Sequence, residues 1–301
     1  MPSHNRRGSG VAALAVVLAA LLAAGAAGCS SGGHKASGAT PAPSVPAAEL
    51  LASSLKNLQG IGSYTAALTI KTGGVPGAGA LGSGGLVLSG GYSAQDAPTQ
   101  LREFKATTVQ AGPLPIGAMD EITTPTDLYI NLPALATLMH SSKPWMRIPK
   151  SGLKAGTGSG LGQLLNEAQS GDPLSAAKLL AGVRNAKTVG TSTIGGVPVT
   201  EISGSEPGTA ILPQLPASDR AALAPSVAKI KRISFTEWID AQRNMRKLVV
   251  NKVSSTGTET LGVTMTSTGK PVRISVPPAG QATTVSARAL SDLGSSLLGG
   301  L

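Results

Sequence analysis

The clearest structural signal in the sequence is the run Ser63-Tyr64-Thr65-Ala66-Ala67-Leu68-Thr69-Ile70-Lys71, in which apolar and polar side chains alternate. Successive side chains of a β-strand point to opposite faces of the sheet, so this alternation fits a strand with one buried and one wet face. The run therefore predicts a sheet that covers a core with one face and meets water with the other.

A helix is expected immediately before this strand. Residues 46–59 place four leucines on one helical face, and the two glycines at 60 and 62 end the periodic pattern. The leucines are Leu50, Leu51, Leu55 and Leu58. The segment predicts one amphipathic helix that packs on the sheet.

Further strands are expected at short intervals after the first, with turns rich in Gly and Pro between them. They span residues 86–92, 100–109, 116–123, 127–131, 144–148, 187–194, 197–203, 233–240, 245–253, 258–266 and 272–276. Helical spacing interrupts them over 160–183, with a helix start at Asp172-Pro173, and again near 218–229. This order favours an α+β domain over repeated parallel βαβ units.

The composition of the 301-residue chain is unusual, with 39 Gly and 21 Pro but only 2 Trp, 3 Tyr and 2 Phe. An apolar fraction of 41% is too high for a disordered chain, and no Gly-x-y period indicates collagen. All the aromatic residues lie in predicted strands, so they mark one sheet. The net charge of +10 suits anionic partners such as phospholipid headgroups.

The N-terminus has the pattern of an export signal. Arg6 and Arg7 precede an uncharged stretch over 8–33, and the apolar run 11–27 ends in Ala26-Ala27-Gly28-Cys29-Ser30. Cys29 is the single cysteine, so an internal disulfide is impossible. The site resembles the lipobox of bacterial lipoproteins, in which the cysteine thiol receives a diacylglycerol; the alternative is ordinary cleavage beside an incidental cysteine.

These signals predict a domain plan and a location. Residues 1–28 form a lipoprotein signal peptide, 29–45 a flexible tether, 46–280 the folded domain and 281–301 a C-terminal extension. Lipidation at Cys29 would anchor the protein to the cell membrane on its extracytoplasmic side. That compartment argues against a nucleic-acid partner.

Catalytic and metal-binding groups are scarce. His140 is the one histidine of the predicted domain, and no cluster of His, Cys and carboxylates suggests a metal site or a cofactor. Asp120 with Glu121, or Glu237 with Asp240, form carboxylate pairs of the kind that glycosidases use, although sugar sites also need stacking aromatics. The sequence therefore predicts neither an enzyme nor a cofactor.

A basic cluster occupies residues 229–252 and includes Arg243, Arg246 and Lys247. One interpretation is contact with lipid headgroups or the membrane surface. The other is a set of solvated strand faces around a turn, because long basic side chains usually lie at the surface.

Several degenerate pieces, taken in order, resemble the actinobacterial LppX/LprG-type lipoproteins, whose fold is similar to that of the carrier LolA. They are the lipobox at Cys29, the leucine-rich helix leading into Ser63-Tyr64-Thr65, Leu128-Tyr129-Ile130, 143–148, the hairpin 189–200, Glu237-Trp238-Ile239-Asp240 and 270–278. The resemblance covers about residues 46–278.

The resemblance implies a strongly curved antiparallel sheet, a half barrel with helices over its concave face, enclosing an apolar cavity for acyl chains. Candidate wall residues are Leu68, Ile70, Leu86, Leu88, Leu128, Ile130, Ile233 and Phe235. The alternative for these residues is an ordinary protein-filled core, because alternation indicates burial and does not reveal a void.

Three functions follow from these observations. The first is a lipoprotein that binds and carries acylated lipids or glycolipids without catalysis, with an export or transporter protein as a further partner. The second is an envelope sensor or scaffold that docks a protein partner through the same fold. The third, a hydrolase of wall polymers, depends on Glu237 or Asp240.

Overall fold

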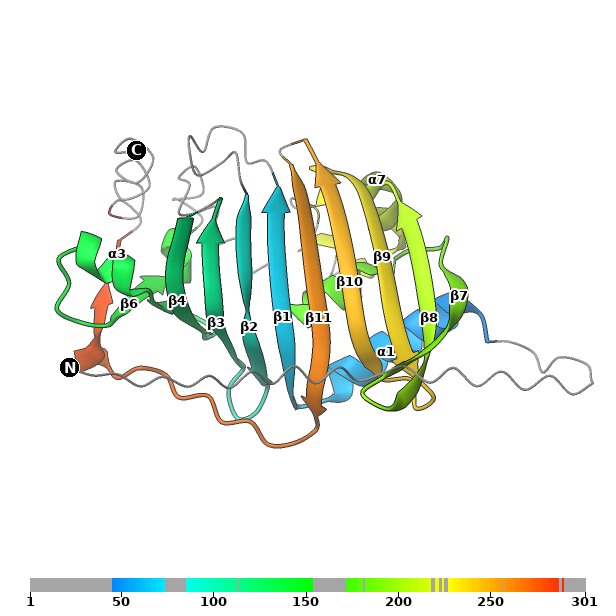
Figure 1. The fold of residues 1–301 in the computed structure, drawn as a ribbon, viewed down its shortest axis with the longest axis horizontal. Helices are drawn as coiled ribbons and strands as arrows, with labels where there is room; N and C mark the ends of the chain where they lie inside the picture. Colours follow the sequence, from blue (N-terminus) through cyan, green and yellow to red (C-terminus); the bar gives the residue numbers. More distant parts are fainter. Residues whose placement is uncertain are drawn as a thin grey trace, which may run out of the picture. The chain divides into compact units, whose positions relative to one another are not determined.

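The structure is a computed structural model that describes residues 45–73, 85–112, 114–153, 172–180, 182–217, 220–221, 224, 227–255, 257–286 and 289. These residues belong to one compact unit, Ser44–Leu301, and all of their strands form a single large sheet (Figure 1). The export signal, the tether and Cys29 lie outside the described residues, as does nearly all of the predicted C-terminal extension beyond residue 286.

The predicted first helix and strand are confirmed. Helix α1 (Ala47–Gly60) buries Leu51 and Leu58, and it ends before Gly62 as expected. Strand β1 (Ser63–Gly73) follows directly, with Tyr64, Ala66, Leu68 and Ile70 all buried. The residues between them point to the opposite, more exposed face.

The N-terminal half of the sheet is an antiparallel meander. It consists of β2 (Leu86–Gln95), β3 (Leu101–Ala111), β4 (Leu114–Thr123), β5 (Asp127–Asn131) and β6 (Trp145–Pro149). Two short helices, α3 (Pro133–Leu138) and α4 (Lys150–Leu153), flank β6 and were not expected from the sequence. They are too short to produce a clear helical period.

The C-terminal half begins with helix α6 (Pro173–Leu180), which starts at the predicted Asp172-Pro173 signal. Strands β7 (Lys187–Ile194) and β8 (Val197–Glu206) follow, then α7 (Gly208–Ile211) and the 3₁₀ turn η1 (Leu212–Gln214). Gly195 and Gly196 both have positive φ, as a two-residue hairpin turn requires. Strands β9 (Ile230–Asp240), β10 (Met245–Ser254) and β11 (Thr258–Thr268) complete this half.

The two halves join at the centre of the sheet. The strand order is β12-β6-β5-β4-β3-β2-β1-β11-β10-β9-β8-β7, so the first strand pairs with the last long one. In this antiparallel seam Leu68 lies opposite Val263, and Ile70 lies opposite Leu261. Figure 1 shows β1 and β11 side by side in the middle of the sheet.

The last predicted strand, 272–276, is wrong. Residues 271–278 are irregular and precede a 3₁₀ turn η2 (Ala279–Gln281) and the short strand β12 (Ala282–Thr284). Lys270-Pro271 and Pro277-Pro278 enclose this segment, and proline supplies no backbone N–H for a ladder. Strand β12 pairs with β6 in parallel, so the sheet is antiparallel with one parallel pair and continues beyond the predicted domain end at 280.

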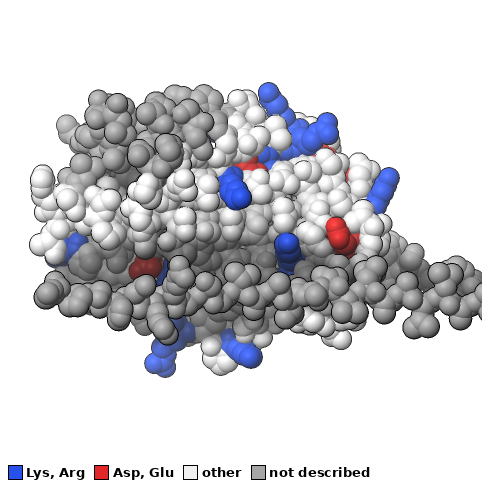
Figure 2. All heavy atoms as spheres, in the orientation of Figure 1, with Lys and Arg blue, Asp and Glu red and all other residues white. Residues whose placement is uncertain are grey.

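The two faces of the sheet differ. The main apolar cluster joins inward residues of β1–β6 and β8–β11 to residues of α1, α6 and α7, so the helices cover this inner face. The outer face carries a smaller cluster around Ile274, in which the irregular segment packs on β3, β4 and β5. Figure 1 looks onto the outer face, with α1 behind the strands. Where Figure 2 draws described residues, this face is mostly uncharged, with dispersed Lys and Arg side chains and a few acidic ones.

The predicted fold class, α+β with a strongly curved, unclosed sheet and helices on its concave face, is thus confirmed. All the aromatic residues lie in strands, as expected. The third helical stretch near 218–229 lies partly outside the described residues.

Candidate functional site

The predicted wall residues come together on the inner face. Leu68 and Ile70 lie on β1, Leu86 and Leu88 on β2, Leu128 and Ile130 on β5, and Ile233 and Phe235 on β9. All eight are buried members of the main apolar cluster. Their burial agrees both with a lipid-lined interior and with a protein-filled core, so their role as cavity walls stays a prediction.

Helix α1 is attached to this face through a buried polar contact. The Ser54 hydroxyl donates a hydrogen bond to Glu237 Oε1 at 2.5 Å, and the Glu237 residue is only 2% exposed. Burial raises the pKa of Glu237 to about 7, while the hydrogen bond from Ser54 opposes this rise. A carboxylate with a single donor in an apolar surround does not match the paired acid and base of a glycosidase.

The same helix also contacts the turn between β9 and β10 through polar side chains. Asn57 Nδ2 donates to the carbonyl oxygens of Gln242 and Arg243 at 3.0 and 3.1 Å. Arg243 in turn places Nη1 3.4 Å from Ser53 Oγ and 3.8 Å from Glu49 Oε1. Helix α1 is therefore held by polar contacts at its outward side and by leucines at its inward side.

The three basic residues predicted to meet headgroups all have partners within the chain. Arg243 contacts α1, Arg246 Nε pairs with the buried Asp240 at 2.8 Å, and Lys247 Nζ lies 4.7 Å from the centre of the Trp238 ring. Asp240 also accepts from the backbone N–H of Asn244, so this carboxylate organises the turn. The geometry favours a structural role for these residues, and their contact with a membrane stays a prediction.

A small polar pocket lies at the N-terminal half of the sheet, beside the apolar cluster. Its volume is about 230 Å³, and Tyr92 and Phe104 form its apolar wall. The remaining lining residues are Gln100, Arg102, Glu103, Glu121, Thr123, Thr124, Pro125, Lys150, Asp172 and Ser175. None of the predicted wall residues lines it.

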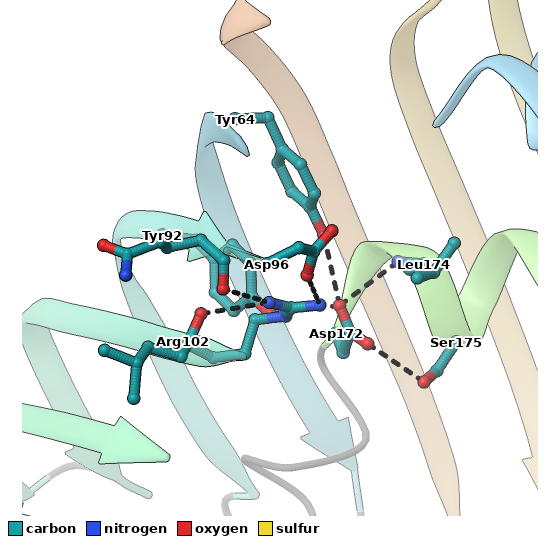
Figure 3. Close-up of polar contacts among 9 residues, drawn as sticks. Tyr64, Tyr92, Asp96, Arg102, Asp172, Leu174 and Ser175 are labelled. Atoms are coloured by element: carbon teal, nitrogen blue, oxygen red, sulfur yellow. Dashed lines mark hydrogen bonds and ion pairs between the residues drawn. The ribbon is translucent and has the colours of Figure 1, made fainter. Parts of the chain in front are cut away.

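Asp172 is the centre of the hydrogen-bond network at one side of this pocket (Figure 3). Its Oδ1 accepts from the hydroxyls of Tyr64 and Tyr92 at 3.3 and 3.0 Å and from the backbone N–H of Leu174 at 3.2 Å. Its Oδ2 accepts from the Ser175 hydroxyl at 3.1 Å. Asp172 thus caps α6 and attaches this helix to β1 and β2.

The two tyrosines and Arg102 are fixed by the same network. The tyrosine rings stack at 6.1 Å, and burial together with the charge of Asp172 raises both hydroxyl pKa values. Arg102 pairs with Asp96 at 2.8 Å and donates to the carbonyl oxygens of Gln95 and Leu101. Of these groups, Tyr92 and Arg102 line the pocket, and the polar groups of both are already engaged within the chain.

Glu121 lies at the other side of the pocket. It is 5% exposed, and its Oε1 accepts from the Thr123 hydroxyl at 3.2 Å. Within the described part of the chain, Glu121 Oε2 is buried without a hydrogen-bond partner. Burial raises the pKa of Glu121 to about 7, against the opposing effects of Thr123 and the Lys150 charge.

Sequence reasoning found Glu121 with Asp120, and Glu237 with Asp240, as two alternative carboxylate pairs, and it did not predict that either glutamate is buried. Asp172 was recognised as a helix start but not as the acceptor for two tyrosines, and Ser54 and Lys150 were not recognised at all. The alternation pattern did hold a signal for Glu121. Glu121 follows Met119 at a two-residue interval, so a strand that points Met119 inward also points the Glu121 carboxylate inward.

Other chemical candidates are limited. In the described ranges, no group of three or more His, Cys, Asp or Glu side chains is arranged to hold a metal ion. Across the same residues, no helix is long and apolar enough to cross a membrane. His140 is an exposed turn residue after α3.

An open curved sheet with an apolar inner face and helices across it defines the class of fold. Part of the chain is also similar to a known protein family. Residues 174–274, from α6 to the segment after β11, match the model of the LppX_LprAFG lipoprotein family. The resemblance inferred from the sequence is thereby confirmed for this stretch. No curated protein matches the chain significantly.

The chain is also similar to several solved structures. LprF from Mycobacterium bovis is 16% identical, with a TM-score of 0.44 over 77% of this chain and 96% of that one. The lipoprotein LppX from Mycobacterium tuberculosis is 19% identical, with a TM-score of 0.45 over 75% and 98%. A LolA superfamily protein from Nitrosomonas europaea is 8% identical, with a TM-score of 0.28 over 73% and 92%.

Proposed function

We propose that this protein is an exported lipoprotein, anchored through Cys29 to the extracytoplasmic side of the cell membrane, that binds and carries acylated lipids. The observation that carries the proposal is the apolar inner face of an unclosed sheet. This face is continuous from β5 to β9, and helices pack across it. No catalytic step is part of it.

The energetics of acyl chains suit such a face. Burial of an acyl chain contributes about 0.8 kcal/mol per methylene group, so a long tail binds without specific polar contacts. Helices α6 and α7 are short, and α1 and α6 contact the sheet mainly through apolar side chains. Their polar contacts include Ser54 with Glu237 for α1 and Asp172 with Tyr64 and Tyr92 for α6. An acyl chain that enters between helix and sheet would replace contacts of leucine side chains with equivalent apolar contacts.

Native mass spectrometry of the chain from Ser30 onward, before and after incubation with a palmitoyl lipid, tests the proposal. This chain contains the whole compact unit Ser44–Leu301. A lipid adduct on the wild-type protein is expected. The absence of any adduct under both conditions, with the protein folded by circular dichroism, would contradict lipid binding and favour the docking of a protein partner.

A matched pair of variants on β1 locates the binding face. Leu68 is buried on the inner face, whereas its neighbour Ala67 is exposed on the outer face. Leu68→Trp is expected to reduce lipid loading because the indole fills inner space, and Ala67→Trp is expected to load as the wild type does. Equal loading of both variants, each folded, would place the lipid elsewhere.

A further inference from the structure

Among the described polar groups that are buried in the lining of the pocket, Glu121 has unused hydrogen-bonding capacity. Asp172 and Arg102 already have several partners each, as described above. Glu121 Oε2, by contrast, is a buried acceptor without a donor in the described part of the chain. An unsatisfied buried acceptor is costly and uncommon in native proteins, so a missing donor at this position needs an explanation.

Glu121 is placed in the pocket by the register of the sheet. On β4 it lies opposite Phe104 of β3 and Ile130 of β5, both of which belong to the main apolar cluster. Phe104 and Glu121 also line the pocket together. The unpartnered oxygen is therefore at the border between the apolar interior and the polar pocket.

Lys150 supplies the complementary donor. It lines the same pocket and is close enough for its charge to lower the pKa of Glu121, and no hydrogen bond or ion pair of its ammonium group is present among the described residues. Burial lowers the pKa of Lys150 itself, which the charge of Glu121 opposes. An acceptor and a donor with spare capacity thus lie on one small pocket.

The charges of the lining select the kind of group that fits. A phosphate or carboxylate would meet the acidic side chains of Glu121, Glu103 and Asp172, and a cation would meet Lys150 and Arg102. A neutral group with neighbouring hydroxyls can donate a hydrogen bond to Glu121 and accept one from Lys150. At about 230 Å³ the pocket is smaller than the roughly 300–1,000 Å³ of typical ligand pockets, so it suits a single small group.

We propose that this pocket binds the neutral, hydroxyl-rich headgroup of an acylated lipid, with one headgroup hydroxyl donating to Glu121 Oε2 and a neighbouring oxygen accepting from Lys150 Nζ. The proposal rests on the proposed function, since the acyl chain would extend from the headgroup past Phe104 and Tyr92 into the apolar interior.

Two ligands with the same acyl chain test the assignment. 1-Palmitoylglycerol carries two neighbouring hydroxyls, whereas methyl palmitate carries no hydrogen-bond donor. Affinities are measured for the chain from Ser30 onward by native mass spectrometry titration, at a pH above the Glu121 pKa of about 7. The wild-type protein is expected to bind 1-palmitoylglycerol at least about tenfold more tightly than methyl palmitate, because a hydrogen bond to a charged group contributes an affinity gain of this size.

Variants identify the residues responsible. Glu121→Gln keeps the shape but replaces the acceptor Oε2 with a donor, and Lys150→Met removes the ammonium group. Each is expected to remove most of the preference for 1-palmitoylglycerol and to leave methyl palmitate binding within about twofold of wild type. Asp120→Asn is the matched control, because Asp120 precedes Glu121 on β4 and pairs opposite Lys105 outside the pocket.

The outcomes separate this proposal from lipid binding itself. Equal binding of both ligands, unaffected by Glu121→Gln, would overturn the headgroup site while lipid binding stands. Failure of both ligands to bind would overturn both proposals. Binding of free glycerol as tight as that of 1-palmitoylglycerol would overturn the assignment to a lipid headgroup and indicate a site for free polyols.

Discussion

The buried Glu237 makes the stability of the fold depend on pH in a direction opposite to that of most carboxylates. Its pKa is about 7 in the folded protein, compared with an ordinary value of 4.5. Between these values the folded state keeps a proton that the unfolded chain has released, so the free energy of unfolding falls as the pH rises from 4.5 to 7. Above pH 7 the loss is complete.

The magnitude follows from the same two values. Each pH unit between them corresponds to about 1.4 kcal/mol, so ionisation of Glu237 lowers the free energy of unfolding by about 3 kcal/mol. Glu121 has the same pKa of about 7 and contributes in the same window. The two carboxyls together give the wild-type protein about twice the slope of either one.

Glu237→Gln isolates one of these contributions. The amide stays neutral at every pH, and its oxygen still accepts from the Ser54 hydroxyl. Its new N–H groups lack an acceptor, which reduces the gain in the free energy of unfolding. We expect a free energy of unfolding higher than that of the wild type by about 1–3 kcal/mol above pH 7, and about half the wild-type slope below it.

Urea unfolding followed by far-ultraviolet circular dichroism, repeated across this pH range, measures both quantities. Glu49→Gln serves as the control, because its side chain is 60% exposed on the same region of the molecule, at the start of α1. It should keep the wild-type slope. An unchanged slope in Glu237→Gln, together with equal or lower stability above pH 7, would refute the account of a buried carboxyl that resists ionisation.

Two further changes test the attachment of α6 and of the outer segment. Asp172→Ala removes the acceptor for the Tyr64 and Tyr92 hydroxyls and the cap of α6. Urea unfolding should show a free energy of unfolding lower by about 1–3 kcal/mol, and amide hydrogen exchange in α6 should become faster. Unchanged exchange in α6 would contradict the capping role. Ile274→Ala removes the centre of the outer apolar cluster, and thermal unfolding should report a loss of about 2–5 kcal/mol. The exposed Val276→Ala is its control, and an equal loss in both variants would argue against the packing of 271–278 on the sheet.

The fold was predictable from sequence wherever alternation was long. Residues 63–71 and 245–253 alternate over many positions, and the structure forms strands there with nearly the expected bounds. The strand over 187–194 was predicted from the hairpin signal Gly195-Gly196, and it also has the expected bounds. The segment 272–276 also alternates, but its neighbouring prolines and its long-range packing on the outer face prevent pairing. Local pattern cannot distinguish a strand from an extended segment packed on a sheet.

The candidate site was predictable only in part. The apolar wall residues were found because alternation directly marks the inward face. The polar pocket joins Glu121 of β4, Lys150 after β6 and Asp172 before α6, which lie at separate places in the chain. Such a site arises from strand order and register, and neither is encoded within a single local stretch.

The pairing of β1 with β11 has a consequence for the order in which the protein assembles. The meander β1–β6 and the group β7–β11 each consist of neighbours in sequence, but the seam between them joins Tyr64 to Thr268. Contacts this distant form slowly, and until they form, the long ladder edges of β1 and β11 remain open to other chains. A chain that ends before Thr258 would pair β1 with β2 on one side only, so residues 258–268 must be synthesised before the sheet can close its centre.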